Sequence, residues 1–177
     1  MKILNIAGKA KNGKTSVAEI IKRKLEKKGK KVLIMNYADT LKFYCREYFG
    51  WDGNKDEDGR GILQKIGTDI VRQREPDFWV RCVANFISVF GQDFDLIIIP
   101  DCRFVNECEF FKDEYHVMNV RIERLNFDNG LTEEQKNHPS ETSLNIYCFD
   151  YYLESESGLK NLEKTVGNFM KHLNEWL

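Results

Sequence analysis

The hydrophobic pattern of the chain alternates between short apolar runs and longer amphipathic stretches. Apolar runs at residues 2–6, 32–35, 94–100, 117–122 and 149–153 predict β-strands. Apolar residues recur at helical spacing after residue 14, within 60–74 and 77–90, and from 159 to 176, which predicts amphipathic helices. This alternation predicts an α/β fold in which a parallel sheet is flanked by helices, giving three layers.

Two polar segments interrupt this pattern. Residues 52–59 (DGNKDEDG) are a predicted turn. Residues 126–141 are polar and contain Gly130 and Pro139, so they are a predicted loop or lid. Because no repeat, low-complexity tract or linker divides the chain, we expect a single domain over residues 1–177.

Composition excludes several function classes. The chain has 27 basic and 28 acidic residues, and this balance gives no general attraction to nucleic acid or to a membrane surface. The five cysteines form no close pair, which argues against a zinc site and favours reduced thiols. There is no signal-peptide pattern, and no apolar stretch approaches the roughly 20 residues of a membrane-spanning helix. We therefore expect a soluble protein of the cytoplasm.

Residues 8–15 (GKAKNGKT) match the phosphate-binding pattern G-x-x-x-x-G-K-[ST] in full. The motif lies between a predicted strand and a predicted helix, where its mechanism requires it. Its glycines let backbone N–H groups approach phosphate oxygens, and the helix that follows directs its positive end at the same anion. We expect a nucleoside triphosphate to bind at Gly8, Lys9, Ala10, Lys11, Asn12, Gly13, Lys14, Thr15 and Ser16.

This loop predicts the binding of a triphosphate without defining the reaction. Lys14 is expected to act on the β- and γ-phosphates, and the hydroxyl of either Thr15 or Ser16 to bind Mg²⁺. A GTPase would need a guanine-reading NKxD sequence, which is absent. Residues 56–59 spell DxxG but follow no core strand, so they are interpreted as a turn. The short chain favours a small kinase.

The predicted helix at residues 60–74 has two chemically different faces. At about 100° per residue, Ile62, Leu63, Ile66 and Ile70 fall on one side. The opposite side carries two guanidinium groups, an amide and a hydroxyl, which belong to Arg60, Gln64, Thr68 and Arg72. Guanidinium groups bind phosphate through paired hydrogen bonds, and an amide can recognise the edge of a base. This side is therefore a candidate substrate-binding surface.

Further candidates follow the predicted strands, because ligands of parallel sheets bind at the carboxyl ends of the strands. Asp101 and Arg103 follow one strand: Asp101 is a candidate for ordering Mg²⁺ or its waters, and Arg103 for holding the transferred phosphate or the acceptor phosphate. Asp39 and Lys42 follow another strand in the same way. Trp79 suits either stacking on a base or a place in the core.

Together these segments resemble the deoxynucleoside monophosphate kinases of tailed bacteriophages and their bacterial relatives. The resemblance rests on GKAKNGKTSVA, YADTLK, GRGILQKIGTDIVRQREPDFWV, DLIIIPDCRFVNE, NHPSE and FDYYLES. It implies an adenylate-kinase-like P-loop fold with an acceptor-binding region at about residues 37–90 and a lid at about 126–141. It places in or beside the acceptor site Asp39, Lys42, Arg60, Gln64, Thr68, Asp69, Arg72, Trp79, Asp101 and Arg103.

The chain departs from relatives of this kind in two ways. Many of them carry Asp after the P-loop lysine, whereas here Thr15 and Ser16 follow Lys14. Lids of the adenylate kinase type often supply several arginines, but residues 126–141 contain none, and Arg124 just before them is the best substitute.

The resemblance implies transfer of the γ-phosphoryl group from MgATP to a deoxynucleoside monophosphate, with Lys14 acting on the donor. Arg60, Arg72, Arg103 and Arg124 would act on the acceptor and on the moving charge. Two alternatives stay open, namely another small-molecule kinase such as a phosphomevalonate-type enzyme, and a nucleotide-binding module without turnover. Which base is accepted, whether ribose is tolerated, and whether the protein forms a homodimer are not determined by the sequence.

Overall fold

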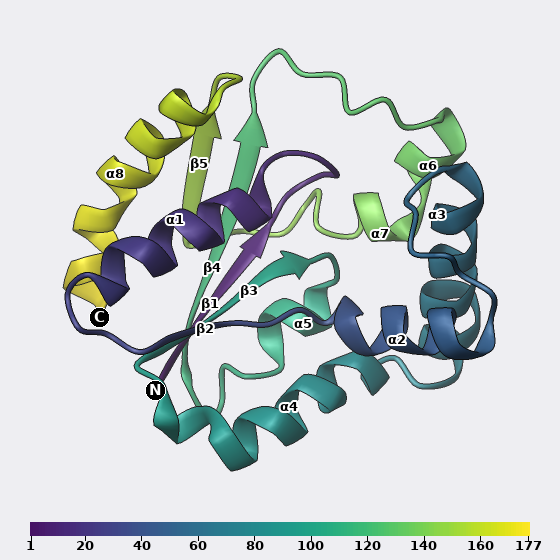
Figure 1. The fold of residues 1–177 in the computed structure, drawn as a ribbon, viewed down its shortest axis with the longest axis horizontal. Helices are drawn as coiled ribbons and strands as arrows, with labels where there is room; N and C mark the ends of the chain where they lie inside the picture. The colour runs from purple at the N-terminus through teal and green to yellow at the C-terminus, as the bar shows by residue number, and fades with distance from the viewer.

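The computed structural model describes residues 1–177 and contains one five-stranded sheet (Figure 1). Its strands are β1 (Lys2–Ala7), β2 (Val32–Ile34), β3 (Leu96–Cys102), β4 (His116–Arg124) and β5 (Tyr151–Ser155). Their order across the sheet is β2-β3-β1-β4-β5, and every neighbouring pair is parallel. Because β1 is central, the loop that follows it lies in the middle of the carboxyl edge of the sheet.

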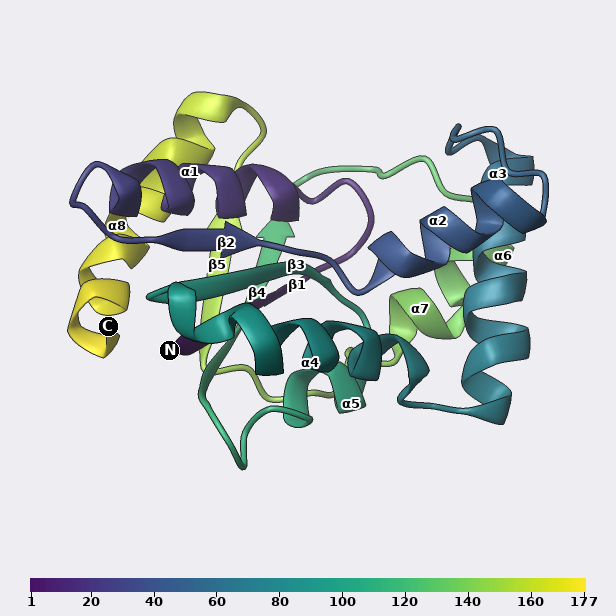
Figure 2. The same ribbon diagram turned by 60° about the horizontal axis from the view of Figure 1, so that its bottom comes forward.

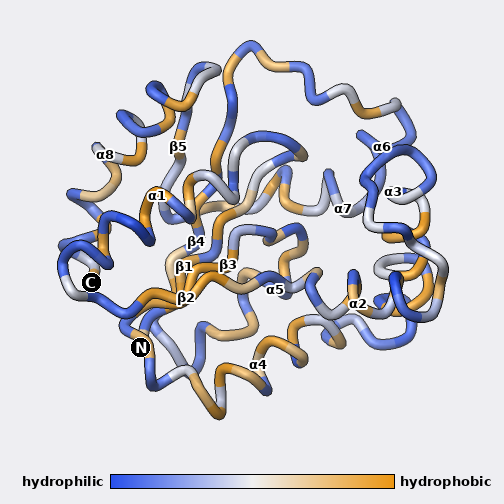
Figure 3. The backbone as a smooth tube through the Cα atoms, viewed as in Figure 1, coloured by the Kyte–Doolittle hydropathy of each residue, from blue (hydrophilic) through white to orange (hydrophobic).

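Helices cover both faces of this sheet, so the predicted three-layer α/β fold is confirmed (Figure 2). On one face, α1 (Lys14–Glu26) and α8 (Leu159–Trp176) bury residues such as Val17, Ile21 and Phe169 against the strands. On the other face, α4 (Phe78–Phe90) packs Val80 and Ile87 into the core, and α5 (Val105–Glu109) contributes Cys108. The strands between them form the apolar centre of the molecule (Figure 3).

The remaining helices lie together beyond the carboxyl ends of β1 and β3, away from both termini (Figure 1). They are α2 (Ala38–Tyr48), α3 (Glu57–Gln64), the π-helix η1 (Lys65–Arg72), α6 (Glu133–Asn137) and α7 (Pro139–Thr142). A short 3₁₀ helix, η2 (Gly91–Asp93), joins α4 to β3. This group of helices contributes the wall of the candidate site that faces α1.

The prediction of a single α-helix at residues 60–74 is wrong in two respects. The helix begins earlier, at Glu57, because the Asp56 side chain accepts a hydrogen bond from the backbone N–H of Gly59 and caps the first turn. It also changes to a π-helix after Gln64. Trp79 donates its indole N–H to the Gly67 carbonyl at 3.0 Å, an acceptor that an α-helix would use internally.

The polar segment at residues 126–141 contains more regular structure than a plain loop. Thr132 caps α6 by accepting a hydrogen bond from the backbone N–H of Gln135. Pro139 occupies the first turn of α7, where its missing backbone N–H costs the helix no hydrogen bond. The last strand also ends two residues later than the apolar run suggested, at Ser155. None of the helices is both long and apolar enough to cross a membrane.

Candidate active site

The loop between β1 and α1 has the conformation that its glycines permit. Gly8 has φ 148° and Gly13 has φ 93°, which other residues adopt only with strain. A Cβ on Gly8 would lie 2.5 Å from the Ile122 carbonyl oxygen, so this glycine also lets β1 run close to β4. Helix α1 begins at Lys14, so its N-terminal N–H groups adjoin the loop. The loop has the features of a phosphate cradle.

Lys14 is folded back onto this cradle. Its ammonium group donates to the carbonyl oxygens of Gly8 at 2.7 Å and Lys9 at 2.9 Å, and the residue is only 9% exposed. Burial, with repulsion from Arg103, lowers the pKa of Lys14 to about 7, although Glu141 and Asp101 oppose the change. A phosphate ligand would restore the charge of this lysine, because a nearby anion favours the ammonium form.

Glu141, at the end of the predicted lid, makes direct contact with the cradle. One carboxylate oxygen accepts the backbone N–H of Ala10 at 3.0 Å, and the other is ion-paired with Arg103. The Glu141 side chain is only 6% exposed. A carboxylate therefore lies where the loop is built to receive an anion. The sequence analysis did not single out Glu141, because the two partners lie 131 residues apart in the chain.

One cavity of about 560 Å³ joins the cradle to the helices beyond the sheet. Its wall includes Ala10, Lys11, Gly13, Lys14, Thr15 and Ser16 from the loop and the start of α1. Seven basic side chains line it, against three carboxylates, and this excess of positive charge suits phosphorylated ligands. The basic residues are Lys11, Lys14, Lys42, Lys55, Arg60, Arg72 and Arg103, and the acidic ones are Asp101, Glu107 and Glu141.

All four residues of the polar side predicted for the helix at 60–74 line this cavity, namely Arg60, Gln64, Thr68 and Arg72. They do so although the helix changes from α to π geometry after Gln64. The opposite side was predicted less well, because Leu63 also lines the cavity instead of joining the core.

Arg72 is the most firmly held of these four residues. Its guanidinium carbon lies 3.9 Å from the centroid of the Phe104 ring, and one terminal nitrogen is ion-paired with Glu107. The other terminal nitrogen donates to the Pro76 carbonyl oxygen at 3.2 Å. Side-chain exposure in the ion pair is 11% for Arg72 and 3% for Glu107, so the pair lies in the wall of the cavity and not at the molecular surface.

Asp101 lies in the same wall, at the carboxyl end of β3. Its two oxygens accept the backbone N–H groups of Tyr37 and Ala38, each at 3.0 Å, and so hold the start of α2. Desolvation raises the pKa of Asp101, although these two N–H groups oppose the change. Arg103, two residues further on, donates to the Ser140 carbonyl oxygen and pairs with Glu141, so it connects β3 to α7.

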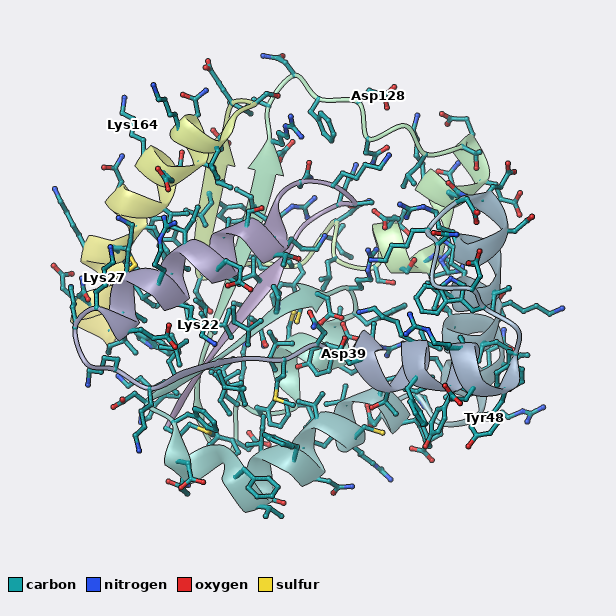
Figure 4. The ribbon with its side chains drawn as sticks, viewed as in Figure 1. Lys22, Lys27, Asp39, Tyr48, Asp128 and Lys164 are labelled. Carbon is teal, nitrogen blue, oxygen red and sulfur yellow. The ribbon has the colours of Figure 1, made fainter.

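The structure leaves several predicted site residues outside the cavity. Asp39 is exposed at the start of α2, where it binds Lys42 and Asn36 (Figure 4). Asp69 is exposed and lies 3.6 Å from His138. Arg124 lies over the Phe127 ring and donates to Ser157 at 3.0 Å, and these contacts direct it toward the start of α8. Gly8, Lys9 and Asn12 shape the cradle but do not line this cavity.

Trp79 is buried, with 3% exposure, and its indole N–H is used by the Gly67 carbonyl. Trp79 lines the cavity, but its only polar group is already bonded within the protein. Of the two roles expected for Trp79, a place in the core describes its packing better than stacking on a base. Sequence reasoning also missed Lys55, whose pKa is lowered by burial and by the neighbouring Lys42 and Arg60. The position of Lys55 within the polar segment at 52–59 does not indicate that its side chain lines the cavity.

Comparison with known proteins identifies the family. The model of the family "Deoxynucleotide monophosphate kinase" matches residues 53–166, well over half of the chain. The chain belongs to this family. The matched range begins after the phosphate cradle and covers most of the cavity wall opposite it, apart from residues 36–42, together with residues 126–141. Membership therefore does not depend on the phosphate-binding loop, which many unrelated activities share.

Two curated phage proteins show the same relationship. The chain is 25% identical over 114 residues to the deoxynucleotide monophosphate kinase of Escherichia phage RB69. It is 30% identical over 117 residues to the deoxynucleoside-5'-monophosphate kinase of Escherichia phage T5. These matches cover 63% and 62% of the chain, but only 44% of each phage protein. The chain thus matches less than half of the length of either enzyme.

Solved structures of other kinases share the fold. The dephospho-CoA kinase of Campylobacter jejuni has a TM-score of 0.57 at 11% identity, covering 99% of this chain and 98% of its own. The shikimate kinase of Aquifex aeolicus has a TM-score of 0.52 at 14% identity, covering 99% and 97%. The APS kinase CysC of Mycobacterium tuberculosis, in complex with AMPPNP and APS, reaches 0.53 at 14% identity, covering 96% and 97%. At these identities the likeness establishes the P-loop kinase fold alone.

Proposed function

We propose that this protein transfers the γ-phosphoryl group of ATP to a deoxynucleoside monophosphate, giving ADP and a deoxynucleoside diphosphate. The observation that carries the proposal is the single cavity in which the phosphate cradle faces Arg72, Arg103 and Gln64. Phosphoryl transfer needs the two substrates held in line in one enclosed space. The family match over residues 53–166, which contribute most of the cavity wall opposite the cradle, supports a nucleoside monophosphate as the second substrate.

The chemical work of this chain would be positioning and charge compensation. The cradle N–H groups and Lys14 would hold the β- and γ-phosphates of ATP. Arg72 would hold the phosphate of the acceptor from the opposite wall. Arg103, which contacts Glu141 beside the cradle, is placed to follow the charge as it moves between the two substrates. No general base is needed, because the acceptor phosphate is already an anion at neutral pH.

The residues present suit Mg²⁺. The hydroxyls of Thr15 and Ser16 and the carboxylate of Asp101 line the same cavity, and Mg²⁺ prefers oxygen ligands. No cluster of three or more His, Cys, Asp or Glu side chains forms a separate metal cage. This fits an ion held largely by the substrate phosphates and water. When bound with ATP, Mg²⁺ supplies compensation of the phosphate charge, and Thr15, Ser16 and Asp101 would hold it or its waters.

The second feature of the proposal is closure. Water must be kept from the γ-phosphate, and residues 126–141 reach the cradle through Glu141 and Arg103. We propose this segment as the lid. Arg124 is directed away from the cavity, whereas Arg103 lines it. We therefore propose Arg103, in place of Arg124, as the arginine that acts on the phosphates when the lid closes.

The test is ADP formation from MgATP, with each ribo- and deoxyribonucleoside monophosphate offered singly. We expect turnover with one or more of the deoxy compounds, and a kcat lower by about a hundredfold or more in the Lys14→Ala variant. ATP binding without turnover of any acceptor would favour the alternative of a nucleotide-binding module. Turnover confined to a non-nucleotide phosphate, such as phosphomevalonate, would favour another small-molecule kinase.

A further inference from the structure

Glu107 is a buried carboxylate that neither the P-loop motif nor the substrate-binding stripe explains. It lies on α5 with 2% exposure, in the wall of the cavity. Removing a carboxylate from water costs several kcal/mol unless hydrogen bonds and a counter-charge offset it. The partners of Glu107 therefore indicate what it does in the site.

Those partners come from two different elements. One oxygen of Glu107 accepts the backbone N–H groups of Arg103 at 2.6 Å and Phe104 at 3.1 Å, which fixes the turn after β3. The other oxygen is ion-paired with Arg72 on η1. A single carboxylate thus joins the turn that carries Arg103 to the helix that carries Arg72.

The second contact determines where the Arg72 guanidinium can lie. Its remaining partners are neutral: the Phe104 ring, the Pro76 carbonyl and the Asn106 side chain. Glu107 is the only acidic group with which Arg72 forms an ion pair. Without that charge, the guanidinium would lose its strongest contact and could adopt other rotamers, or turn toward another carboxylate of the cavity.

We propose that Glu107 is a positioning residue that sets Arg72 and the Arg103 turn in the geometry that receives the acceptor phosphate. The ion pair uses one terminal nitrogen of Arg72, and its Nε–H has no protein acceptor, so we expect the Nε–H to donate to a phosphate oxygen of the acceptor. Glu107 would act through these two arginines without contacting either substrate. This inference rests on the proposed function.

The test is Glu107→Gln, which keeps the shape of the side chain and one acceptor oxygen for the backbone N–H groups. It removes the charge and places an amide against Arg72. We expect the KM for the monophosphate to rise about tenfold, the effect of losing roughly 1.4 kcal/mol, with the KM for ATP within about twofold of the wild type. The matched control is Glu109→Gln, which changes an exposed glutamate on the same helix and should behave as the wild type.

A double-variant cycle shows whether Glu107 acts through Arg72. If it does, Glu107→Gln should change the acceptor KM far less in an Arg72→Ala background than in the wild type, because the shared contact is already lost. Equal effects in the two backgrounds, or equal rises in the KM of both substrates, would show a purely structural role and overturn the inference. Should Glu107→Gln fail to fold, Glu107→Asp keeps the charge but shortens its reach, and unchanged acceptor binding by that variant would overturn the inference equally.

Failure of the proposed function would look different. If the wild type neither binds nor phosphorylates any nucleoside monophosphate, the proposed function and this role of Glu107 fall together. If the wild type turns over a deoxynucleoside monophosphate while Glu107→Gln matches Glu109→Gln, only the positioning role is refuted.

Discussion

The backbone N–H of Ala10 donates a 3.0 Å hydrogen bond to the side chain of Glu141, so a carboxylate occupies part of the phosphate cradle. The same carboxylate is ion-paired with Arg103, one of the cations proposed to stabilise the moving phosphoryl group. If ATP binds at the cradle as proposed, its phosphates would compete with Glu141 for the Ala10 N–H and for Arg103. Nucleotide binding would thereby release Arg103 and move the end of α7 in one step.

This competition predicts the effect of Glu141→Gln on ATP binding. The neutral amide competes less well for Ala10 and Arg103, and it removes a negative charge beside the phosphates. We expect the Kd for ATP to fall about threefold to tenfold, since a hydrogen bond to a charged group contributes roughly 1.5 kcal/mol. Calorimetric titration checks this, with Glu134→Gln on the exposed side of α6 as the matched control. An equal or weaker ATP affinity in Glu141→Gln would contradict the displacement model.

Lys14→Ala should remove catalysis while the fold survives. Lys14 contacts only carbonyl oxygens of its own loop, so no core packing depends on its ammonium group. The loss of kcat should be about a hundredfold or more, as for other groups that stabilise charge in the transition state. Steady-state rates and the melting temperature are the measurements, and Lys27→Ala at the far end of α1 is the control (Figure 4). Normal turnover by a folded Lys14→Ala variant would refute the assignment of the cradle.

Arg72→Lys is expected to be a damaging change despite keeping the charge. Lysine cannot make paired hydrogen bonds in one plane, and it lacks the planar guanidinium whose carbon lies 3.9 Å from the centroid of the Phe104 ring. The KM for the monophosphate should rise about tenfold, because about 1.4 kcal/mol of binding is lost, while the KM for ATP hardly changes. Arg74→Lys, an exposed neighbour, should have no effect. Equal weakening of both substrates would place Arg72 outside the acceptor site.

Glu107 also predicts how stability depends on pH. Burial raises the pKa of Glu107 from 4.5 to about 7, although Arg72 and the N–H group of Arg103 oppose the change. The folded protein then binds more protons at this group than the unfolded chain between pH 4.5 and 7, so the free energy of unfolding should decrease across that interval as pH rises. The contribution of this one group is at most roughly 3 kcal/mol.

Urea denaturation at several pH values measures this contribution. Glu107→Gln cannot titrate, so its free energy of unfolding should decline less between pH 4.5 and 7 than that of the wild type. Asp101, whose pKa is also raised by burial, remains ionisable in both proteins. Parallel curves for the two proteins would mean that Glu107 does not titrate in this range.

Hydrogen exchange tests whether residues 126–141 act as a lid. Few of their side chains are buried, so the amides of this segment should exchange quickly in the free protein. They should slow clearly when a bisubstrate analogue joining adenosine to a deoxynucleoside is bound. Strand β1 supplies the control, since its central amides should be protected in both states. Equal rates with and without the analogue would show that closure comes from another segment, such as residues 52–59.

The sequence was sufficient to predict those parts of the structure that are determined by contacts between residues close together in the chain. The cradle depends on glycines within eight residues and on the helix that follows them, so its pattern could be recognised directly. The apolar runs that became β1 and β3 were equally clear, because a strand covered on both faces is mostly apolar along its length. The four-residue spacing of Gln64 and Thr68 also predicted that they share one side of their helix, and this side lines the cavity.

The π-helix at Lys65–Arg72 could not be predicted in this way. The same residues would fit an α-helix, and the difference is that each backbone N–H of a π-helix pairs with the carbonyl five residues earlier instead of four. Contacts from other elements accompany the change, namely the Trp79 indole on the Gly67 carbonyl and the close packing of Leu41 on Gly67. Neither contact leaves a periodic signal in the segment itself.

The sequence alone therefore determined the phosphate cradle, the layered α/β fold and the polar side of the helical segment formed by α3 and η1. Tertiary structure alone decided which charged side chains meet. Arg124 is close in sequence to the lid, yet Ser157 and Phe127 hold it away from the cavity. Glu141 and Glu107 reach the cradle and Arg72 across 131 and 35 residues of chain. An ion pair depends on distances in space, and these are set by the order of the strands and the packing of the helices beyond them.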